Sequence, residues 1–161
     1  MTSLNPLHTI NKQIEEIIIT HNKVSKKEVK NKTTELLKEV GLQDIAKRPK
    51  VYPYELSGGQ RQRAMIAMSI ANNPDLLIAD EPTTALDVTI QMQILNLLSN
   101  LQKKLGMTLL FISHDLSVVK KMADFIYVMK EGEVIEYGIN KKIFETPDKE
   151  YTKQLLSLIH I

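Results

Sequence analysis

The stretch ELSGGQRQRAMIAMS, Glu55 to Ser69, decides how this chain is read, because it places two adjacent glycines at the mouth of a helix. Each glycine in a helix interior costs roughly 1 kcal/mol relative to alanine. The pair therefore predicts close approach by a group that a side chain would block. Ser57 and Gln60 have the spacing of a capping box, which predicts a helix that begins near Ser57. A tight capped turn over Gly58 and Gly59 is the alternative explanation.

Two short apolar runs follow this helix, with a long amphipathic segment between them. The runs are Leu76 to Ala79 and Thr108 to Ile112, and the segment Thr89 to Leu105 has helical periodicity. Strands that are apolar on both faces and joined by a helical crossover are typical of a parallel sheet with covered faces. This part of the sequence therefore predicts an α/β fold.

Helices are predicted before this centre, and a mixture of helices and strands after it. Residues 4 to 40 carry two helical stripes, and Gly41 is predicted to end the second helix. The pattern therefore predicts an all-helical first third and an α/β remainder, with a boundary near Tyr54–Ser57. The elements predicted beyond the second apolar run are a helix over Leu116–Met122, a hairpin of Phe125–Met129 and Val134–Tyr137, and short helices over Lys141–Phe144 and Tyr151–Leu158.

Composition and charge narrow the class of protein. A chain of 161 residues with 43% hydrophobic and 25% charged residues can form one globular domain with a sizeable core. The absence of cysteine excludes disulfides and thiolate metal sites. No apolar run approaches the ~20 residues of a spanning helix, so we expect any membrane association to go through a partner. The lysine-rich segment Lys23–Lys32 is interpreted as a solvated helix face, with a polyanion site as the alternative.

Polar side chains follow each apolar run at the carboxyl end, where open parallel sheets bind ligands. Asp80 is a candidate Mg²⁺ ligand, because Mg²⁺ on phosphates takes one or two carboxylates. Glu81 is a candidate for polarising an attacking water, and His114 could contact the same phosphate. Each residue also has an ordinary explanation as a turn residue, a helix cap or a surface histidine. Asp87 could simply cap the helix that follows it.

The order and spacing of these motifs resemble the nucleotide-binding subunit of an ABC transporter. The resemblance implies a partial ABC ATPase fold of the P-loop NTPase type. It implies the helical subdomain, with the signature helix, over residues 1–72, and the C-terminal part of the parallel sheet, an α/β part, over residues 73–161. The motifs that carry it are LSGGQ at Leu56–Gln60, LLIADEP at Leu76–Pro82, TALD at Thr84–Asp87 and the strand that ends in His114.

This resemblance implies a role for each candidate residue, with ATP and Mg²⁺ as cofactors. In the family the signature motif LSGGQ faces the γ-phosphate of ATP on the other subunit, at the positive end of a helix. Arg61 and Arg63 would strengthen the positive field there, or else face solvent or a subunit. The implied roles are nucleotide binding for Ser57, Gly58, Gly59 and Gln60, magnesium binding for the Walker B residue Asp80, catalysis for Glu81 and the switch histidine His114, and nucleotide contact for the D-loop residue Asp87.

Further motifs are similar to those of importers of dipeptides and oligopeptides. They imply a second ABC ATPase subunit and transmembrane permease subunits as partners, with no nucleic acid. They also imply a cytoplasmic position on the inner face of the cell membrane. These motifs are SLNP at Ser3–Pro6, EPTTALDVTIQ at Glu81–Gln91, EYG at Glu136–Gly138 and P-x-x-x-YT-x-x-LL at Pro147–Leu156.

The sequence also departs from the family pattern. The family's phosphate loop, G-x-x-x-x-G-K-[ST], cradles the phosphates, and no Gly-Lys pair occurs here. The adenine-stacking aromatic residue and the family's C-terminal extension have no counterpart either. We therefore expect a truncated or split ATPase component that does not hydrolyse ATP alone. We also expect marginal stability, because the strands Leu76–Ala79 and Leu109–Ile112 would expose apolar edges and faces. The alternatives are a non-catalytic partner that supplies only the signature motif and D-loop, an inactive remnant, or an ATPase of DNA repair, whose coiled-coil heptads are not found.

Overall fold

The computed structural model describes residues 4–157, which form helices and two small sheets. The chain divides into two compact units, one that ends at Leu110 and one that begins at Phe111. They are called the first unit and the second unit below. Among the described residues, no helix is long and apolar enough to cross a membrane.

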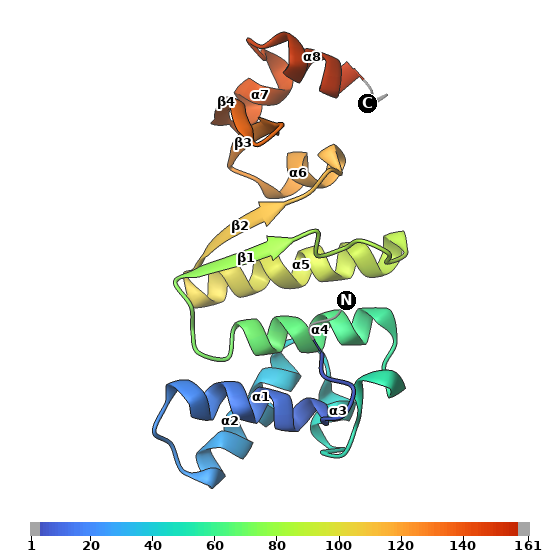
Figure 1. The fold of residues 1–161 in the computed structure, drawn as a ribbon, viewed down its shortest axis with the longest axis vertical. Coiled ribbons are helices and arrows are strands. Elements are labelled where there is room, and N and C mark those ends of the chain that lie inside the picture. Colours follow the sequence, from blue (N-terminus) through green and yellow to red (C-terminus); the bar gives the residue numbers. More distant parts are fainter. Residues whose placement is uncertain (1–3, 158–161) are drawn as a thin grey trace. The chain divides into compact units, whose positions relative to one another are not determined.

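Helices make up the N-terminal part of the first unit (Figure 1). Their apolar stripes converge, so that Ile10, Ile14 and Leu37 are fully buried, as the helical periodicity predicts. Gly41, with φ of +79°, ends the second helix as predicted. The elements are α1 (Ile10–His21), α2 (Lys26–Glu39), α3 (Gln43–Ala46), the 3₁₀ helix η1 (Pro53–Glu55) and α4 (Gly58–Ser69).

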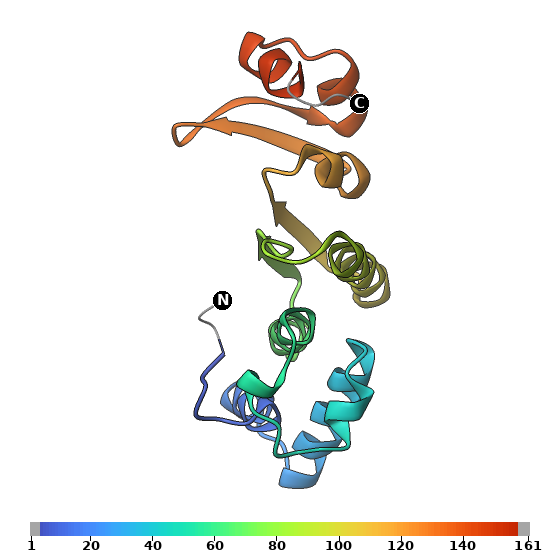
Figure 2. The ribbon, with the colours of Figure 1, turned by 90° about the vertical axis from the view of Figure 1, so that its right-hand side faces the viewer.

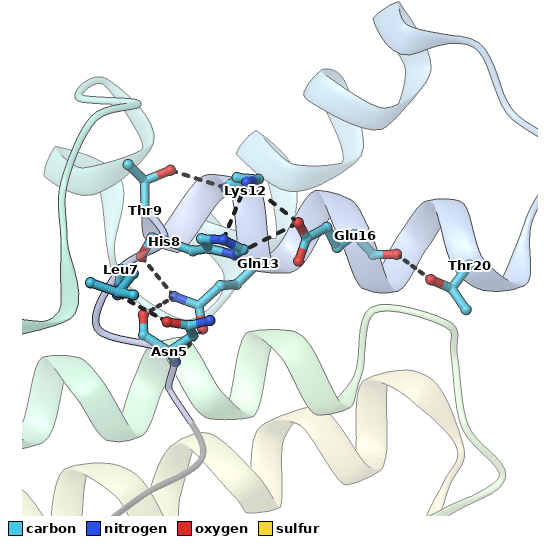
Figure 3. Close-up of polar contacts among 8 residues, drawn as sticks. All are labelled: Asn5, Leu7, His8, Thr9, Lys12, Gln13, Glu16 and Thr20. Atoms are coloured by element: carbon cyan, nitrogen blue, oxygen red, sulfur yellow. Dashed lines mark hydrogen bonds and ion pairs between the residues drawn. The ribbon is translucent and has the colours of Figure 1, made fainter.

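A buried glutamine holds the segment before α1 in place (Figure 3). The Gln13 side chain accepts a hydrogen bond from the Asn5 N–H at 2.8 Å and donates to the carbonyls of Asn5 and His8 at 3.1 and 2.9 Å. Thr9 then caps α1 by accepting from the Lys12 N–H at 3.3 Å. The backbone groups of this turn are therefore bonded to the helix that they precede.

The first sheet pairs β1 (Leu76–Asp80) with β2 (Thr108–Ile112), and α5 (Val88–Leu105) connects them. The two strands point in the same direction, which confirms the parallel pair, and α5 lies alongside β1 (Figure 1 and Figure 2). The general expectation of covered faces does not hold for this sheet, whereas the expectation that its strands expose apolar faces is confirmed. Leu77 and Ala79 are buried, but Leu76 and Ile78 are 49% and 58% exposed. The described residues supply helices for one face only, so alternate side chains of β1 stay bare.

The second unit contains an antiparallel hairpin of β3 (Phe125–Lys130) and β4 (Glu133–Ile139). Glu131 and Gly132 both have positive φ, +51° and +85°, as a tight hairpin turn requires, which confirms the predicted hairpin. The remaining elements are α6 (Leu116–Met122), α7 (Asn140–Glu145) and α8 (Glu150–Ser157).

The two faces of this hairpin have different surroundings. Ile126 and Val128 on the inner face are buried against Ile143 of α7. Tyr127 and Tyr137 pair across the outer face with ring centroids 5.8 Å apart, and they are 60% and 62% exposed. Like the first sheet, the hairpin therefore has one apolar face that the described residues leave bare.

A buried carboxylate links β4 to the loop before α8. Glu136 is buried and accepts hydrogen bonds from the backbone N–H groups of Asp148 at 2.8 Å and Lys149 at 3.1 Å. Burial opposes its ionisation, but the Thr152 hydroxyl and these two N–H groups outweigh burial and lower the pKa of Glu136. The Glu136–Gly138 motif, singled out as a subfamily feature, thus also has a structural role in this unit.

The predicted helices and strands agree with the structure to within a few residues, with two omissions. The short helices α3 and η1 were not predicted, because four or fewer residues carry no measurable periodicity. Leu158, the last residue of the final predicted helix, lies outside the described residues. The division between a helical part and an α/β part at residue 72 stays a prediction.

Candidate nucleotide-binding site

The turn before α4 has the capping box that the sequence predicts. The Ser57 hydroxyl oxygen accepts from the Gln60 N–H at 3.2 Å, and the Gln60 side chain accepts from the Ser57 N–H at 3.0 Å. The N–H groups of Gly58 and Gly59 make no hydrogen bond to any described residue. Two backbone donors therefore remain at the positive end of a helix, an arrangement that suits an anion.

Packing inside the chain also requires glycine at position 59, but not at position 58. A Cβ atom added at Gly59 would lie 2.7 Å from Cγ2 of Ile90 in α5, closer than two carbons can approach. A Cβ atom at Gly58 would lie 3.4 Å from Cδ2 of Leu86, which is ordinary contact. The close approach predicted from the sequence thus has one partner within this chain, and it concerns Gly59 more than Gly58.

Arg63 in α4 has a contact that the sequence did not predict. Its guanidinium donates to the Val40 carbonyl at 2.8 Å and to the Gln93 side chain at 3.2 Å. These bonds tie α4 to the end of α2 and to α5, so Arg63 positions the helix that carries the signature turn. The Nε of Arg61 is buried and has no hydrogen-bond partner among the described residues.

The acidic residues after β1 lie on a strained segment. Asp80 is exposed at the end of the strand, whereas Glu81 is half-buried with φ of +47°. Ala85 has φ of +64°, which non-glycine residues also rarely adopt. The Thr84 hydroxyl donates to the Glu81 carboxylate at 2.8 Å. Such strain costs of order 1–3 kcal/mol per residue and clusters at functional sites.

A groove of about 590 Å³ runs between α4 and this segment. Asp80 and Glu81 therefore share one concave surface with residues of α4 for which the sequence motifs predict no role. The spacing of Gln62, Ile66 and Ser69 at three and four residues could have indicated this shared face of α4. The groove is lined by Gln62, Met65, Ile66, Ser69, Leu77, Ile78, Ala79, Asp80, Glu81, Pro82, Thr84, Ala85 and Leu98. The described residues contain no group of three or more potential metal ligands.

Asp87 caps α5, which confirms the structural alternative for this residue. Its carboxylate accepts from the Ile90 N–H at 2.9 Å. The same turn of α5 carries Ile90, whose side chain packs against Gly59. Asp87 and the signature turn are therefore connected through Ile90, and a contact between Asp87 and nucleotide stays a prediction.

His114 belongs to the second unit, where it is exposed directly after β2. Its neighbours fix the local backbone: Ser113 accepts from the Asp115 N–H at 3.0 Å, and Asp115 caps α6 by accepting from Ser117 and Val118 at 3.0 and 3.2 Å. The position of His114 relative to Glu81 stays a prediction.

Comparison with solved structures supports the same fold. A bacterial ABC transporter cassette, MJ0796, solved as a dimer, matches with a TM-score of 0.73 and 34% identity. The match covers 86% of this chain and 59% of that one. The structure of MJ0796 in a post-hydrolysis state with ADP and Pi matches equally well.

Several curated proteins are similar in sequence over almost the whole chain. The peptidoglycan transport ATP-binding protein YejF of Agrobacterium fabrum is 55% identical over 98% of this chain and 29% of its own length. The dipeptide transport ATP-binding protein DppD of Haemophilus influenzae is 55% identical over 97% of this chain and 47% of its own length. The oligopeptide transport ATP-binding protein OppD of Bacillus subtilis is 52% identical over 98% of this chain and 44% of its own length. The chain thus spans less than half the length of these relatives.

The family comparison covers the helical part and the first strand. The sequence model of the ABC transporter family matches residues 2–84, which include the signature turn, Asp80 and Glu81. With a partial cassette fold, a capped signature turn and this match, the chain belongs to the ABC transporter family.

Proposed function

We propose that the chain is part of the ATP-binding component of a peptide importer. The names of the similar proteins, which transport dipeptides, oligopeptides or peptidoglycan, support this substrate class. In this proposal the chain works with a second ATPase subunit and with permease subunits, on the cytoplasmic face of the membrane. No role with nucleic acid is proposed.

The observation that carries the proposal is the signature turn with two unbonded backbone donors. The N–H groups of Gly58 and Gly59 lie at the N-terminus of the 12-residue helix α4, where partial positive charge attracts phosphate. The Ser57 oxygen accepts the capping hydrogen bond, so its hydroxyl proton can be donated to a ligand. Three donors within three residues fit the γ-phosphate of an ATP held by another subunit.

The residues after β1 fit the magnesium and hydrolysis roles of the family. Asp80 is one exposed carboxylate, which suffices for Mg²⁺ because this ion keeps several of its waters. Bound Mg²⁺ would supply charge neutralisation at the phosphates. Glu81 is proposed as the base that orients the attacking water, with Thr84 holding one carboxylate oxygen. Asp87 and His114 are proposed as further contacts of the nucleotide.

The lack of a phosphate loop divides these roles into two groups. Asp80, Glu81 and His114 act on a nucleotide that a phosphate loop must position, so we expect no hydrolysis by this chain alone. The signature turn acts on a nucleotide bound elsewhere and needs no such loop in its own chain. Supply of the signature motif to a partner is therefore the part of the proposed function that rests on described residues of this chain alone.

A matched pair of substitutions at Gly58 tests this function. The chain is mixed with an intact homologous ATPase subunit whose catalytic glutamate is replaced by glutamine, and ATP-dependent association is measured by analytical ultracentrifugation. Gly58→Asp places a negative charge at a helix N-terminus, where it favours the helix but repels phosphate. Gly58→Asn has nearly the same size without the charge, and neither variant meets the clash expected at Gly59.

The proposal predicts that the native chain associates only with ATP, that Gly58→Asn retains association, and that Gly58→Asp loses it. Circular dichroism should show the same helix content in all three proteins. Equal association of both variants, or none by the native chain, would contradict a working signature motif. Gly59 is not suitable for this test, because its substitution disturbs Ile90 directly.

A further inference from the structure

Positive charge is concentrated in the sequence around the connection between α1 and α2. These two helices are the N-terminal, blue part of the ribbon in Figure 1. The segment Lys23–Lys32 contains five lysines and one acid, a net charge of +4, whereas the whole chain has +2. The remainder of the chain is therefore net negative. Four of these lysines form what we call the basic corner, namely Lys23, Lys26, Lys27 and Lys30, and all four are exposed.

Three lysines of the basic corner lie on one side of α2, and Lys23 lies in the loop before that helix. Lys27 and Lys30 are three residues apart, and Lys26 and Lys30 are four apart, so they are neighbours on the helix surface. None of the four forms an ion pair or side-chain hydrogen bond with any described residue. By contrast, Lys104 and Lys142 pair with Glu39 and Asp148 at 2.7 and 2.8 Å.

The one acid in the segment is already engaged. Glu28 completes the capping box of α2 by accepting from the Ser25 N–H at 2.8 Å, and the hydrogen bonds of Ser25 lower the pKa of Glu28. The carboxylate is therefore held at the helix mouth, so it cannot swing out to neutralise a lysine without breaking the cap. The positive charge of the corner remains available to an external anion.

Apolar side chains accompany this charge. Val24, between Lys23 and the start of α2, is 40% exposed, and Ile19 in the last turns of α1 is 56% exposed. An anionic membrane surface offers both phosphate groups for lysines and an apolar boundary for such side chains. Nucleic acid offers phosphates but no place to bury Val24 or Ile19. The combination therefore favours lipid over nucleic acid.

We propose that the basic corner binds the anionic headgroups of a phospholipid membrane. This would give the chain a direct membrane contact in addition to any permease subunit, and it does not depend on the identity of the transported substrate. Each lysine near an anionic surface contributes roughly 1 kcal/mol, about a fivefold change in partitioning. Four lysines together should therefore give a measurable preference for anionic lipid.

Vesicle sedimentation with the full chain tests this proposal. Binding is compared for phosphatidylcholine vesicles and for vesicles that also contain phosphatidylglycerol. The basic-corner variant replaces Lys23, Lys26, Lys27 and Lys30 by glutamine. The control variant makes the same replacement at four exposed lysines elsewhere, Lys103, Lys121, Lys149 and Lys153, so that the net charge of the two variants is equal.

The partition coefficient onto anionic vesicles should be at least about tenfold higher for the native chain and the control variant than for the basic-corner variant. High salt should abolish this difference. Val24→Ser should weaken binding to vesicles but not to duplex DNA. Equal loss in both lysine variants would overturn the proposal, because only net charge would then matter. Equal binding to neutral vesicles would also overturn it, in favour of adhesion through the bare sheet faces. Binding to DNA that exceeds binding to anionic vesicles would identify a nucleic-acid surface instead.

Discussion

The helical part of the first unit and the two sheets differ in how completely their own residues bury apolar side chains and pair backbone groups. In the helices, apolar stripes are buried against one another and the ends of α1, α2 and α4 are capped by Thr9, Ser25 and Ser57. In the sheets, alternate side chains such as Ile78 and Tyr127 remain more than half exposed. Helices close their hydrogen bonds locally, whereas a sheet needs neighbours on its edges and faces. The difference indicates that stability is concentrated in the helical part.

The largest expected effect comes from equal truncations in the two regions. Ile14→Ala removes a fully buried side chain from the helical core and should lower the free energy of unfolding by about 2–5 kcal/mol. Ile78→Ala acts on a residue that is 58% exposed and should change the free energy of unfolding by less than about 1 kcal/mol. Urea denaturation followed by circular dichroism measures this free energy for both variants. A loss at Ile78 as large as at Ile14 would mean that the bare face of β1 is covered in solution.

The same two substitutions should act oppositely on apolar dye binding. Ile78→Ala removes part of an exposed apolar face and should reduce fluorescence of a bound hydrophobic dye, while Ile14→Ala should increase it by loosening the core. An unchanged signal for Ile78→Ala would argue against exposure of this face.

A smaller effect is expected where the helical part meets the sheet, at the contact between α4 and α5. Gly59→Ala brings a methyl group to within 2.7 Å of Ile90 and should cost about 1–3 kcal/mol of stability. Gly58→Ala is the matched control and should be close to neutral, since its Cβ has an ordinary contact at 3.4 Å. Thermal melts of both variants provide the measurement. Shortening the neighbour in a Gly59→Ala, Ile90→Ala double variant should recover part of the loss, and no recovery would exclude this clash as the cause.

The smallest expected effect concerns the buried carboxylate behind the hairpin. Glu136→Gln keeps the shape but removes the charge that accepts two backbone N–H groups, so it should cost about 1–2 kcal/mol at neutral pH. The folded state lowers the pKa of Glu136, so its stabilisation is present above the ordinary value of 4.5 and is lost as the pH falls toward the folded value. As the pH is lowered from neutral, the free energies of unfolding of the native chain and Glu136→Gln should therefore converge. A constant difference down to pH well below 4.5 would contradict this linkage.

Much of the fold could be predicted from local patterns. The capping box of Ser57 and Gln60, the stop at Gly41 and the turn at Glu131 and Gly132 all depend on residues close in sequence, and each is confirmed. The sequence also predicts the cap at Asp87, as the structural alternative for that residue. Such features follow from backbone geometry and short-range hydrogen bonds, which neighbouring residues largely determine.

Contacts between distant residues could not be predicted in this way. Nothing in the spacing of Arg63 indicates its bond to the Val40 carbonyl, and nothing in LSGGQ indicates Ile90 as the neighbour of Gly59. The positive φ of Glu81 and its bond to Thr84 also depend on how the segment after β1 is held. These features arise from packing, which a periodic pattern constrains only to a face and not to a partner.

By itself, the sequence determined the family, the order of the helices and strands, and the residue types that could contact a nucleotide. Motifs and periodicities depend only on residues that are close together in the sequence. Only the tertiary structure decided that Gly59 packs against Ile90 of its own chain, that Gln62 and Ser69 share a groove with Asp80, and which side chains of each sheet stay exposed. The physical reason is that burial and close approach are properties of pairs of surfaces, and the second surface lies far away in the sequence or outside the chain.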